Sequence, residues 1–240
     1  MSEVLNPDDF VISRKRKKYK FAKFHNAENC FELDDWKESA KGRTLHKTDV
    51  VELGAGTALF SVELAARYPE KQFAAVDVKA DRLQKGAYMA LERGIKNVRF
   101  IRARADQIGE LFNEYSLEAL WLTFPDPFPR ERSERRRMTH PLYLEKYATL
   151  LKQGVTHNRG ERSDFVFNGL YLKHDNPKFF QWSLEQLVAE KWRIDELSFD
   201  LHGSELSNDY KIQTAYEIRW LADGLTTQFA RCTPPPQAAN

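Results

Sequence analysis

The chain has 240 residues and a formal net charge of +2, from 37 Lys and Arg against 35 Asp and Glu. Hydrophobic residues make up 42% of the sequence, which is enough for a sizeable core and excludes a chain that is disordered throughout. No run approaches the roughly 18 apolar residues that a membrane-spanning helix needs. Cys30 and Cys232 lie far apart without a CxxC spacing or a nearby histidine cluster, so we expect neither a disulfide framework nor a metal site. We expect a cytoplasmic protein without a membrane partner, either a monomer or a homodimer.

Basic residues gather in two places along the sequence. Seven of them fall between Arg14 and Lys23 with no acidic residue among them, and five arginines fall within 130–137 against only Glu131 and Glu134. On a nearly neutral chain, two such patches indicate a polyanionic partner that is bound at defined places. The alternative is that each run is only a solvated arm or helix face.

Strand and helix patterns alternate from residue 49 onward. The predicted strands, in chain order, are 50–53, 73–76, 98–103, 119–124, 165–172, 194–201 and 215–221. The predicted helices cover about 58–68, 81–93, 140–151 and 177–191. This alternation predicts a Rossmann-like α/β fold with a doubly wound, mostly parallel sheet of seven strands. We divide the chain into a basic arm and lead-in (1–48), the α/β domain (49–230) and a disordered tail (231–240), and Asn168-Gly169 is a possible hairpin turn.

The first strand of the α/β domain ends in a glycine turn that follows a carboxylate, in the sequence Glu52-Leu53-Gly54-Ala55-Gly56. In doubly wound sheets this turn leads into a helix N-terminus and binds nucleotides. A dinucleotide site would have a third glycine where Leu59 stands. A carboxylate before the glycines suits the sulfonium and ammonium groups of S-adenosylmethionine better than a pyrophosphate, because like charges repel. The turn therefore favours S-adenosyl-L-methionine over NAD.

Two further carboxylates follow the next two strands. Asp77 ends the second strand, where an acidic residue accepts hydrogen bonds from ribose hydroxyls. Asp106 lies just past the third strand and could bind the adenine amino group. Each aspartate alone is commonly a loop cap. Three carboxylates at three successive strand ends indicate one cofactor site.

The fourth strand runs into a proline-rich segment, Phe124-Pro125-Asp126-Pro127-Phe128-Pro129. Prolines on both sides restrict the backbone of Asp126, so its carboxylate loses little entropy when it binds a ligand. The segment predicts a catalytic or orienting carboxylate. The alternative is a structural loop that covers the edge of the sheet.

These motifs together resemble the bacterial tRNA (guanine-N7)-methyltransferases, which modify guanosine 46 in the variable loop of tRNA. The matching segments, within about residues 50–224, are Glu52-Leu53-Gly54-Ala55-Gly56, Phe124-Pro125-Asp126-Pro127-Phe128-Pro129, the arginine-rich 130–137, Asp175-Asn176 and Thr214-Ala215-Tyr216-Glu217. The resemblance implies transfer of a methyl group from S-adenosyl-L-methionine to N7 of that guanosine, with tRNA as the partner.

The resemblance also implies roles for individual residues. Asp126 is the implied catalytic residue. The implied cofactor contacts are Glu52, Gly54, Gly56, Asp77, Asp106 and Asp126. The implied substrate contacts are Arg130, Arg132, Arg135, Arg136, Arg137, Asp175, Thr214, Ala215, Tyr216 and Glu217.

Four features differ from the family pattern. Phe128 stands where the family usually has Trp, His174 where it has Thr, and Ala215 where it has a basic residue, and Val155–Asn168 resembles an insertion. Two alternatives remain open. One is a methyltransferase of this fold that acts on another RNA or a small substrate, and the other is an RNA-binding protein that has lost catalysis. The two basic patches and the intact acidic residues favour methyl transfer to tRNA.

Overall fold

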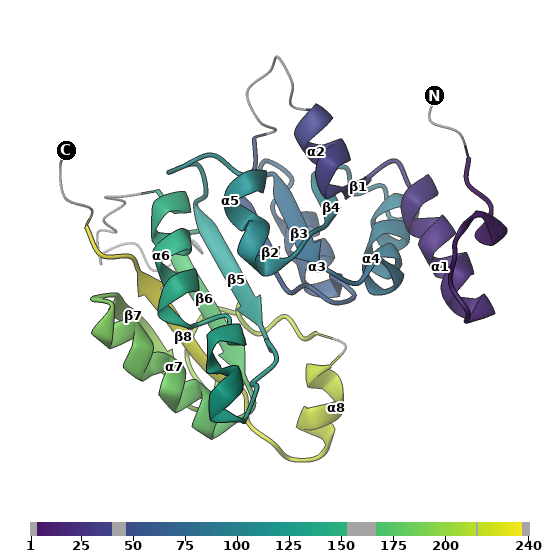
Figure 1. Cartoon of the computed structure of the whole chain (residues 1–240). Coiled ribbons are helices and arrows are strands. Elements are labelled where there is room, and N and C mark those ends of the chain that lie inside the picture. Colours follow the sequence, from purple (N-terminus) through teal and green to yellow (C-terminus); the bar gives the residue numbers. More distant parts are fainter. Residues whose placement is uncertain (1–3, 40–46, 153–166, 215, 237–240) are drawn as a thin grey trace. The chain divides into compact units, whose positions relative to one another are not determined.

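The computed structural model describes residues 4–39, 47–152, 167–214 and 216–236 (Figure 1). The chain forms two compact units, Met1–Leu111 (unit 1) and Phe112–Asn240 (unit 2). No helix in the described ranges is long and apolar enough to cross a bilayer.

Unit 1 contains four parallel strands in the order β1-β4-β3-β2. They are β1 (Cys30–Glu32), β2 (Val50–Leu53), β3 (Phe73–Asp77) and β4 (Val98–Arg102). β2, β3 and β4 confirm the predicted strands, and their apolar, β-branched runs are buried as expected for a parallel sheet. β1 was not predicted, because three residues are too short to show a strand pattern. Since the strands are parallel, β2, β3 and β4 end at the same edge of this sheet.

Helices surround these strands in unit 1. They are η1 (Pro7–Asp9), α1 (Lys15–Asn26), α2 (Leu33–Ser39), α3 (Leu59–Arg67), α4 (Ala80–Glu92), η2 (Ala105–Gln107) and α5 (Ile108–Leu111). α3 and α4 confirm two predicted helices. Leu83, Ala87 and Ala90 form the buried stripe of α4 at helical spacing.

The first basic run forms helix α1, drawn in purple in Figure 1. α1 packs against α4. Phe24 of α1 is 2% exposed, and the Lys23 ammonium lies 5.0 Å from the centre of the Tyr88 ring of α4. Most of the other basic side chains of the run are exposed, including Lys15 and Arg16. The run is therefore a helix that is anchored by one apolar face.

Unit 2 contains four strands in the order β5-β6-β8-β7. They are β5 (Ala119–Thr123), β6 (Gly169–His174), β7 (Arg193–Ser198) and β8 (Gln228–Thr233). β5 and β6 are parallel, and β8 is antiparallel to both β6 and β7. The helices of this unit are η3 (Glu131–Arg136), α6 (Pro141–Leu150), α7 (Pro177–Ala189) and α8 (Glu217–Ala222). α7 packs against α6, β6 and β7.

Three sequence predictions in unit 2 are wrong. The predicted strand 215–221 is instead helix α8, and Ile218, which a buried strand would cover, is 55% exposed. The closing strand is β8, so the expected tail from residue 231 begins inside a strand. The described residues hold eight strands rather than the predicted seven because β1 of unit 1 adds one. Asn168-Gly169 is not a hairpin turn, because Gly169 opens β6 beside its parallel neighbour β5. Residues 153–166, which are most of the apparent insertion, lie outside the described residues, as do residues 237–240 of the tail.

Gly86 lets α4 lie directly against the turn that follows β2. A Cβ atom at this position would lie 2.6 Å from the main-chain oxygen of Thr57 and 3.1 Å from the Cβ of Ala58. Both neighbours belong to the turn itself and have little room to move. The absence of a side chain at Gly86 therefore sets the position of the turn.

We predict that Gly86→Ala lowers the free energy of unfolding by about 1–3 kcal/mol, because the added methyl overpacks this contact. Urea denaturation followed by circular dichroism measures the change. Gly109→Ala in α5 is the matched control, since a Cβ there meets nothing within 4 Å and alanine favours a helix. Equal losses of stability in the two variants would contradict the prediction.

Candidate functional site

The turn after β2 has a left-handed backbone at three nearby positions. The φ angles are +77° at Gly54, +56° at Gly56 and +55° at Ala58. Glycine adopts this conformation without steric cost, which explains two of the three residue types. The amides of Gly54 and Ala55 donate to the carbonyl of Val76 in β3, at 2.8 and 3.1 Å. A Cβ at Gly56 would meet nothing within 4 Å, so a ligand could approach the main chain closely there.

Asp77, at the end of β3, holds this turn with its carboxylate. Its Oδ2 accepts a hydrogen bond from the amide of Gly56 at 2.8 Å, and its Oδ1 accepts one from the amide of Lys79 at 2.8 Å. A carboxylate has about four acceptor positions. The carboxylate can therefore hold the turn and still accept hydrogen bonds from a ligand. The structure thus brings Asp77 and the glycine turn together, as the sequence predicts.

Glu52 is buried in β2, with 2% of its surface exposed. Its Oε2 accepts hydrogen bonds from both the amide and the hydroxyl of Ser61 in α3. This oxygen therefore joins β2 to the first turn of α3, where the positive end of the helix dipole favours a negative charge. Part of this carboxylate has a structural task that the sequence did not reveal.

Asp106 lies in η2, past the end of β4. Its carboxylate accepts hydrogen bonds from Nε of Arg104, at 2.9 Å, and from Nη2 of the same guanidinium. The Asp106 side chain is 44% exposed, so solvent screens this pair. The contact that we predict for Asp106 with an adenine amino group would have to form beside Arg104.

In unit 2, the loop that follows β5 has two aromatic residues in the left-handed conformation. The φ angles are +53° at Phe124 and +39° at Phe128, on either side of Asp126. Such angles cost about 1–3 kcal/mol each for residues other than glycine, and the surrounding structure has to compensate. Asp126 itself is exposed. The loop therefore presents its carboxylate to solvent on a strained backbone.

Arg137 is one of the groups that hold this loop. Its Nε donates to the carbonyl of Pro127 at 3.1 Å and its Nη2 to that of Phe128 at 3.2 Å. The guanidinium lies 4.4 Å from the centre of the Trp182 ring, and the residue is 8% exposed. We expected Arg137 among the substrate contacts. The structure instead buries it beneath the loop, because the carbonyls of a strained turn need donors.

The other four predicted arginines have a different environment. Arg130, Arg132, Arg135 and Arg136 are all exposed. The Arg136 guanidinium lies 4.4 Å from the centre of the Phe128 ring. These four arginines, which we name the arginine patch, remain available to an anionic partner.

Asp175 and Tyr216 meet beside the same loop, although 41 residues separate them. The Tyr216 hydroxyl donates to Oδ2 of Asp175 at 3.1 Å, and the Tyr216 ring lies 5.3 Å from that of Phe124. Partial burial, and then the negative charges of Asp175 and Asp126, raise the pKa of Tyr216 to about 12. The structure therefore brings three predicted site residues close to one another, namely Asp126, Asp175 and Tyr216. We name Phe124, Asp126, His174, Asp175 and Tyr216 the Asp126 cluster.

Glu217 is not presented to a substrate, contrary to the prediction. It is fully buried and accepts hydrogen bonds from Lys173 Nζ at 2.8 Å, His202 Nε2 at 2.8 Å and Thr227 Oγ1 at 3.0 Å. Burial alone would raise the pKa of Glu217, but the hydrogen bonds from His202 and Lys173 hold it below its usual value. Removal of one partner from such a buried pair would leave an uncompensated charge. Glu217 is therefore part of the core of unit 2.

Thr214 is partnered with the same glutamate. The amide of Glu217 donates to Thr214 Oγ1 at 3.0 Å, and the amide of Thr214 donates to Glu217 Oε2 at 3.2 Å. This reciprocal pair has the hydrogen bonds and the Thr-x-x-Glu sequence pattern of a capping box, a signal of a helix start, and lies at the beginning of α8. Ala215, which we also expected among the substrate contacts, lies outside the described residues.

Sequence reasoning missed the part that His174 plays. In the sequence, His174 stands out only as a departure from the family pattern. In the structure its side chain bonds to the loop after β5, with Nε2 at 2.9 Å from the Pro125 carbonyl. A single imidazole in an apolar strand gives no sequence signal for such a contact.

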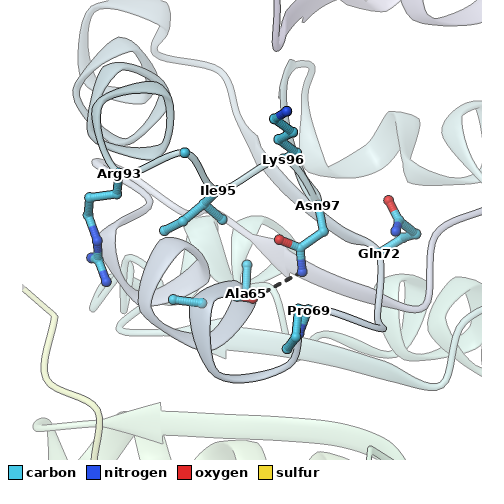
Figure 2. Close-up of a pocket in the computed structure, with 9 residues that line it drawn as sticks. Ala65, Pro69, Gln72, Arg93, Ile95, Lys96 and Asn97 are labelled. Carbon is cyan, nitrogen blue, oxygen red and sulfur yellow. Dashed lines mark hydrogen bonds between the residues drawn. The ribbon is translucent and has the colours of Figure 1, made fainter.

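A cavity in unit 1 has a volume of about 540 Å³, and none of the predicted site residues lines it. Figure 2 shows the residues that line this cavity. Gln72 and Asn97, which directly precede β3 and β4, line it at the amino ends of the strands. Asn97 Nδ2 donates to the carbonyls of Ala65, Tyr68 and Lys71, so it closes the last turn of α3. Ligands of doubly wound sheets bind at the carboxyl ends of strands, so this cavity is not the cofactor site. Among the described residues, no group of three or more His, Cys, Asp and Glu side chains could hold a metal ion.

A family model described as "Putative methyltransferase" matches residues 46–230. A tRNA (guanine-N(7)-)-methyltransferase of Mycoplasmopsis agalactiae is 34% identical over 202 residues, which cover 83% of this chain and 91% of that protein. Proteins of the same name from Brevibacillus brevis and Christiangramia forsetii are 32% and 33% identical. Their alignments cover 81% and 85% of this chain, and 83% and 86% of those proteins.

Two solved structures have a similar fold. An antibiotic-related methyltransferase matches with a TM-score of 0.55 at 16% identity, over 85% of this chain and 94% of that chain. A mutant 16S rRNA (adenine(1408)-N(1))-methyltransferase from Catenulisporales acidiphilia, solved with its cosubstrate SAM, matches with a TM-score of 0.52 at 13% identity, over 87% and 94%. At these identities the likeness shows the fold alone. The chain therefore has the Rossmann-like α/β fold and belongs to the tRNA (guanine-N(7)-)-methyltransferase family.

Proposed function

We propose that this protein transfers the methyl group of S-adenosylmethionine to N7 of a guanosine in tRNA, and that the target is guanosine 46 of the variable loop. Membership of the family gives the reaction class. The observation that carries the proposal is the Asp126 cluster, in which an exposed aspartate between two prolines lies beside the Tyr216–Asp175 pair. A guanine base offers donors to carboxylates and a flat face to aromatic rings, so the cluster suits it.

The residues of unit 1 fit S-adenosylmethionine. The open main chain at Gly56 leaves room for a ligand, and Asp77 can accept hydrogen bonds from ribose hydroxyls beside it. In this proposal Gly54 shapes the turn, Asp106 binds the adenine edge and Glu52 supplies negative charge near the cationic groups. When bound, S-adenosylmethionine supplies an electrophilic methyl group on a sulfonium centre.

Methyl transfer to guanine N7 depends on the positions of the two reactants rather than on proton transfer. Guanine N7 carries an in-plane lone pair and no proton, so its attack on a methyl group needs no general base. Asp126 accepts a hydrogen bond from the exocyclic amine or N1–H of guanine and stabilises the positive charge that develops on the ring. Phe128 and Tyr216 form the rim that receives the extruded base, at an unstacking cost of a few kcal/mol. The arginine patch and α1 bind phosphates of the tRNA.

Unmodified tRNA transcripts incubated with labelled S-adenosylmethionine should accept label at a single guanine N7, at position 46. Reductive strand cleavage at 7-methylguanosine maps the position. A transcript with adenosine at position 46 is the control and should accept no label. Label at another guanosine would reject the position but keep the activity, and no label on any tRNA would reject the proposed function.

Asp126→Asn should lower kcat for tRNA methylation by about 10²- to 10³-fold at saturating cofactor, because the amide keeps the size of the side chain but loses its charge. Single-turnover kinetics with excess enzyme measure the effect. Glu131→Gln removes an exposed carboxylate from the neighbouring η3 and should keep kcat near the wild-type value. Full methyl transfer by the Asp126→Asn variant would show that Asp126 is not catalytic.

Arg135→Gln should reduce the slope of log Kd for tRNA against log salt concentration by about 1, because one phosphate contact is lost. Filter binding at several salt concentrations gives the slope. Arg193→Gln removes the same charge from β7 and should leave the slope unchanged, since its guanidinium already pairs with Asp195. An unchanged slope in the Arg135→Gln variant would exclude this residue from the tRNA interface.

A further inference from the structure

His174 connects β6 to the loop that carries Asp126. It is the last residue of β6 and is 2% exposed. Its Nε2 lies 2.9 Å from the carbonyl oxygen of Pro125. Its Nδ1 lies 2.8 Å from the amide nitrogen of Asn176, which donates to it. The imidazole therefore bridges two segments that lie far apart in the sequence.

These two contacts fix the protonation state of the ring. A carbonyl oxygen can only accept, so Nε2 must carry a proton and donate it to Pro125. The amide of Asn176 can only donate, so Nδ1 must present a lone pair. Both contacts are satisfied at once only by the neutral ring with its proton on Nε2.

The surroundings of His174 favour that neutral form. Burial lowers the pKa of His174. The hydrogen bond to Pro125 and then the charges of Asp175 and Asp126 oppose the change, but the pKa remains below its ordinary value. The ring of Phe179 from α7 packs 4.4 Å away and that of Phe124 lies 6.2 Å away, and neither carries charge. Tyr216, which directly precedes α8, reaches this region through its hydrogen bond to Asp175.

The loop needs the donor that His174 supplies. Phe124 has a φ of +53°, and because a proline follows it, the extended conformation would be its preferred one. Its amide donates to the carbonyl of Lys173 at 2.9 Å, next to His174 in β6. The hydrogen bond from His174 to Pro125 is the next contact along the loop, directly before Asp126.

We propose that His174 is a positioning residue for the proposed methyl transfer: its neutral imidazole holds the Pro125 carbonyl and so fixes the direction in which the Asp126 carboxylate is presented. The inference rests on the proposed function and goes beyond it. Another residue type occupies this position in the family pattern, so the device is a feature of this chain.

Protonation of His174 would leave the hydrogen bond from Nε2 to Pro125 but would release the ring from the Asn176 amide, which holds it in place. A proton on Nδ1 removes the acceptor of the Asn176 amide and places a positive charge 3.2 Å from Oδ1 of Asp175, whose Oδ2 accepts from Tyr216. Because the folded state holds the pKa of His174 below the ordinary value of about 6.5, the contact between Nδ1 and the Asn176 amide is complete above that pH. It is lost as the pH falls from there through the lowered pKa. The kcat of the wild-type enzyme should therefore fall on the acidic side of neutrality.

Three variants separate the hydrogen bond from packing. His174→Gln keeps a donor near the position of Nε2 and does not titrate. His174→Phe keeps the volume of the ring but has no donor. Phe179→Leu weakens the packing against the imidazole and removes no hydrogen bond. Two measurements are made on each variant in the full chain: kcat for tRNA methylation between pH 5 and 9, and amide hydrogen exchange of the peptide over 122–137.

His174→Phe should lower kcat by about 10- to 100-fold, since small displacements of a catalytic group cost that much, and should speed exchange in the peptide. His174→Gln should stay within about 3-fold of the wild type at pH 8, and the fall in its kcat should move down to the carboxylate range near pH 4. Phe179→Leu should lower the Tm but keep the wild-type pH profile.

The inference is overturned if His174→Phe keeps wild-type kcat and exchange, or if His174→Gln loses as much activity as His174→Phe. It is also overturned if the acidic fall in kcat persists unchanged in His174→Gln. Should the wild-type protein fail to methylate tRNA, the proposed function fails, and the exchange rates of the two His174 variants still decide whether this residue holds the loop.

Discussion

The unfavourable backbone of the loop after β5 is the constraint on which the candidate site depends. Phe124 and Phe128 both have positive φ angles, and two prolines flank Asp126 between them. A loop of this shape does not persist by itself, because its residues prefer other conformations. Buried donors hold it, with Arg137 on one side of Asp126 and His174 on the other. The strain and the donors together keep an exposed carboxylate in one orientation.

The acidic residues that the sequence motifs mark fall into two groups, which differ in burial and in their hydrogen-bond partners. Glu217 is surrounded by Lys173, His202 and Thr227 in the core, and Glu52 holds the start of α3. Asp126 is exposed, and the Asp175 carboxylate holds the hydroxyl of a half-exposed tyrosine. Sequence motifs mark all of these residues equally. Only burial and hydrogen-bond partners separate the carboxylates that stabilise the fold from those that a ligand can reach.

Much of the fold follows from local sequence patterns. The buried strands β2, β3 and β5 and the helices α3 and α7 were predicted within a few residues, because apolar periodicity and the glycine or proline at their ends decide them. The strand expected at 215–221 is wrong, because its apolar residues fit a strand as well as a helix and the hydrogen bonds between Thr214 and Glu217 that precede α8 were not considered. β1 and β8 depend on pairing with strands distant in sequence, which periodicity does not report.

The sequence predicts which types of residue form the candidate site, but not which of them are buried or what they contact. The carboxylates at the strand ends and the proline-braced Asp126 follow from the sequence. The burial of Arg137 does not, because the arginines of that segment look alike until Trp182, from a distant helix, covers one of them. The role of His174 depends on a carbonyl 49 residues away, which no local pattern could indicate.

The strand order of unit 2 has a consequence for how the chain reaches its native state. β8 lies between β6 and β7, so β7 has no hydrogen-bonded neighbour in this sheet until β8 has been synthesised. At Gly169, β6 lies so close to β8 that a Cβ would be 2.2 Å from the Cys232 carbonyl oxygen. A nascent chain leaving the ribosome can therefore complete the sheet of unit 1 early. In unit 2, β7 remains unpaired until β8 has been synthesised and pairs with it.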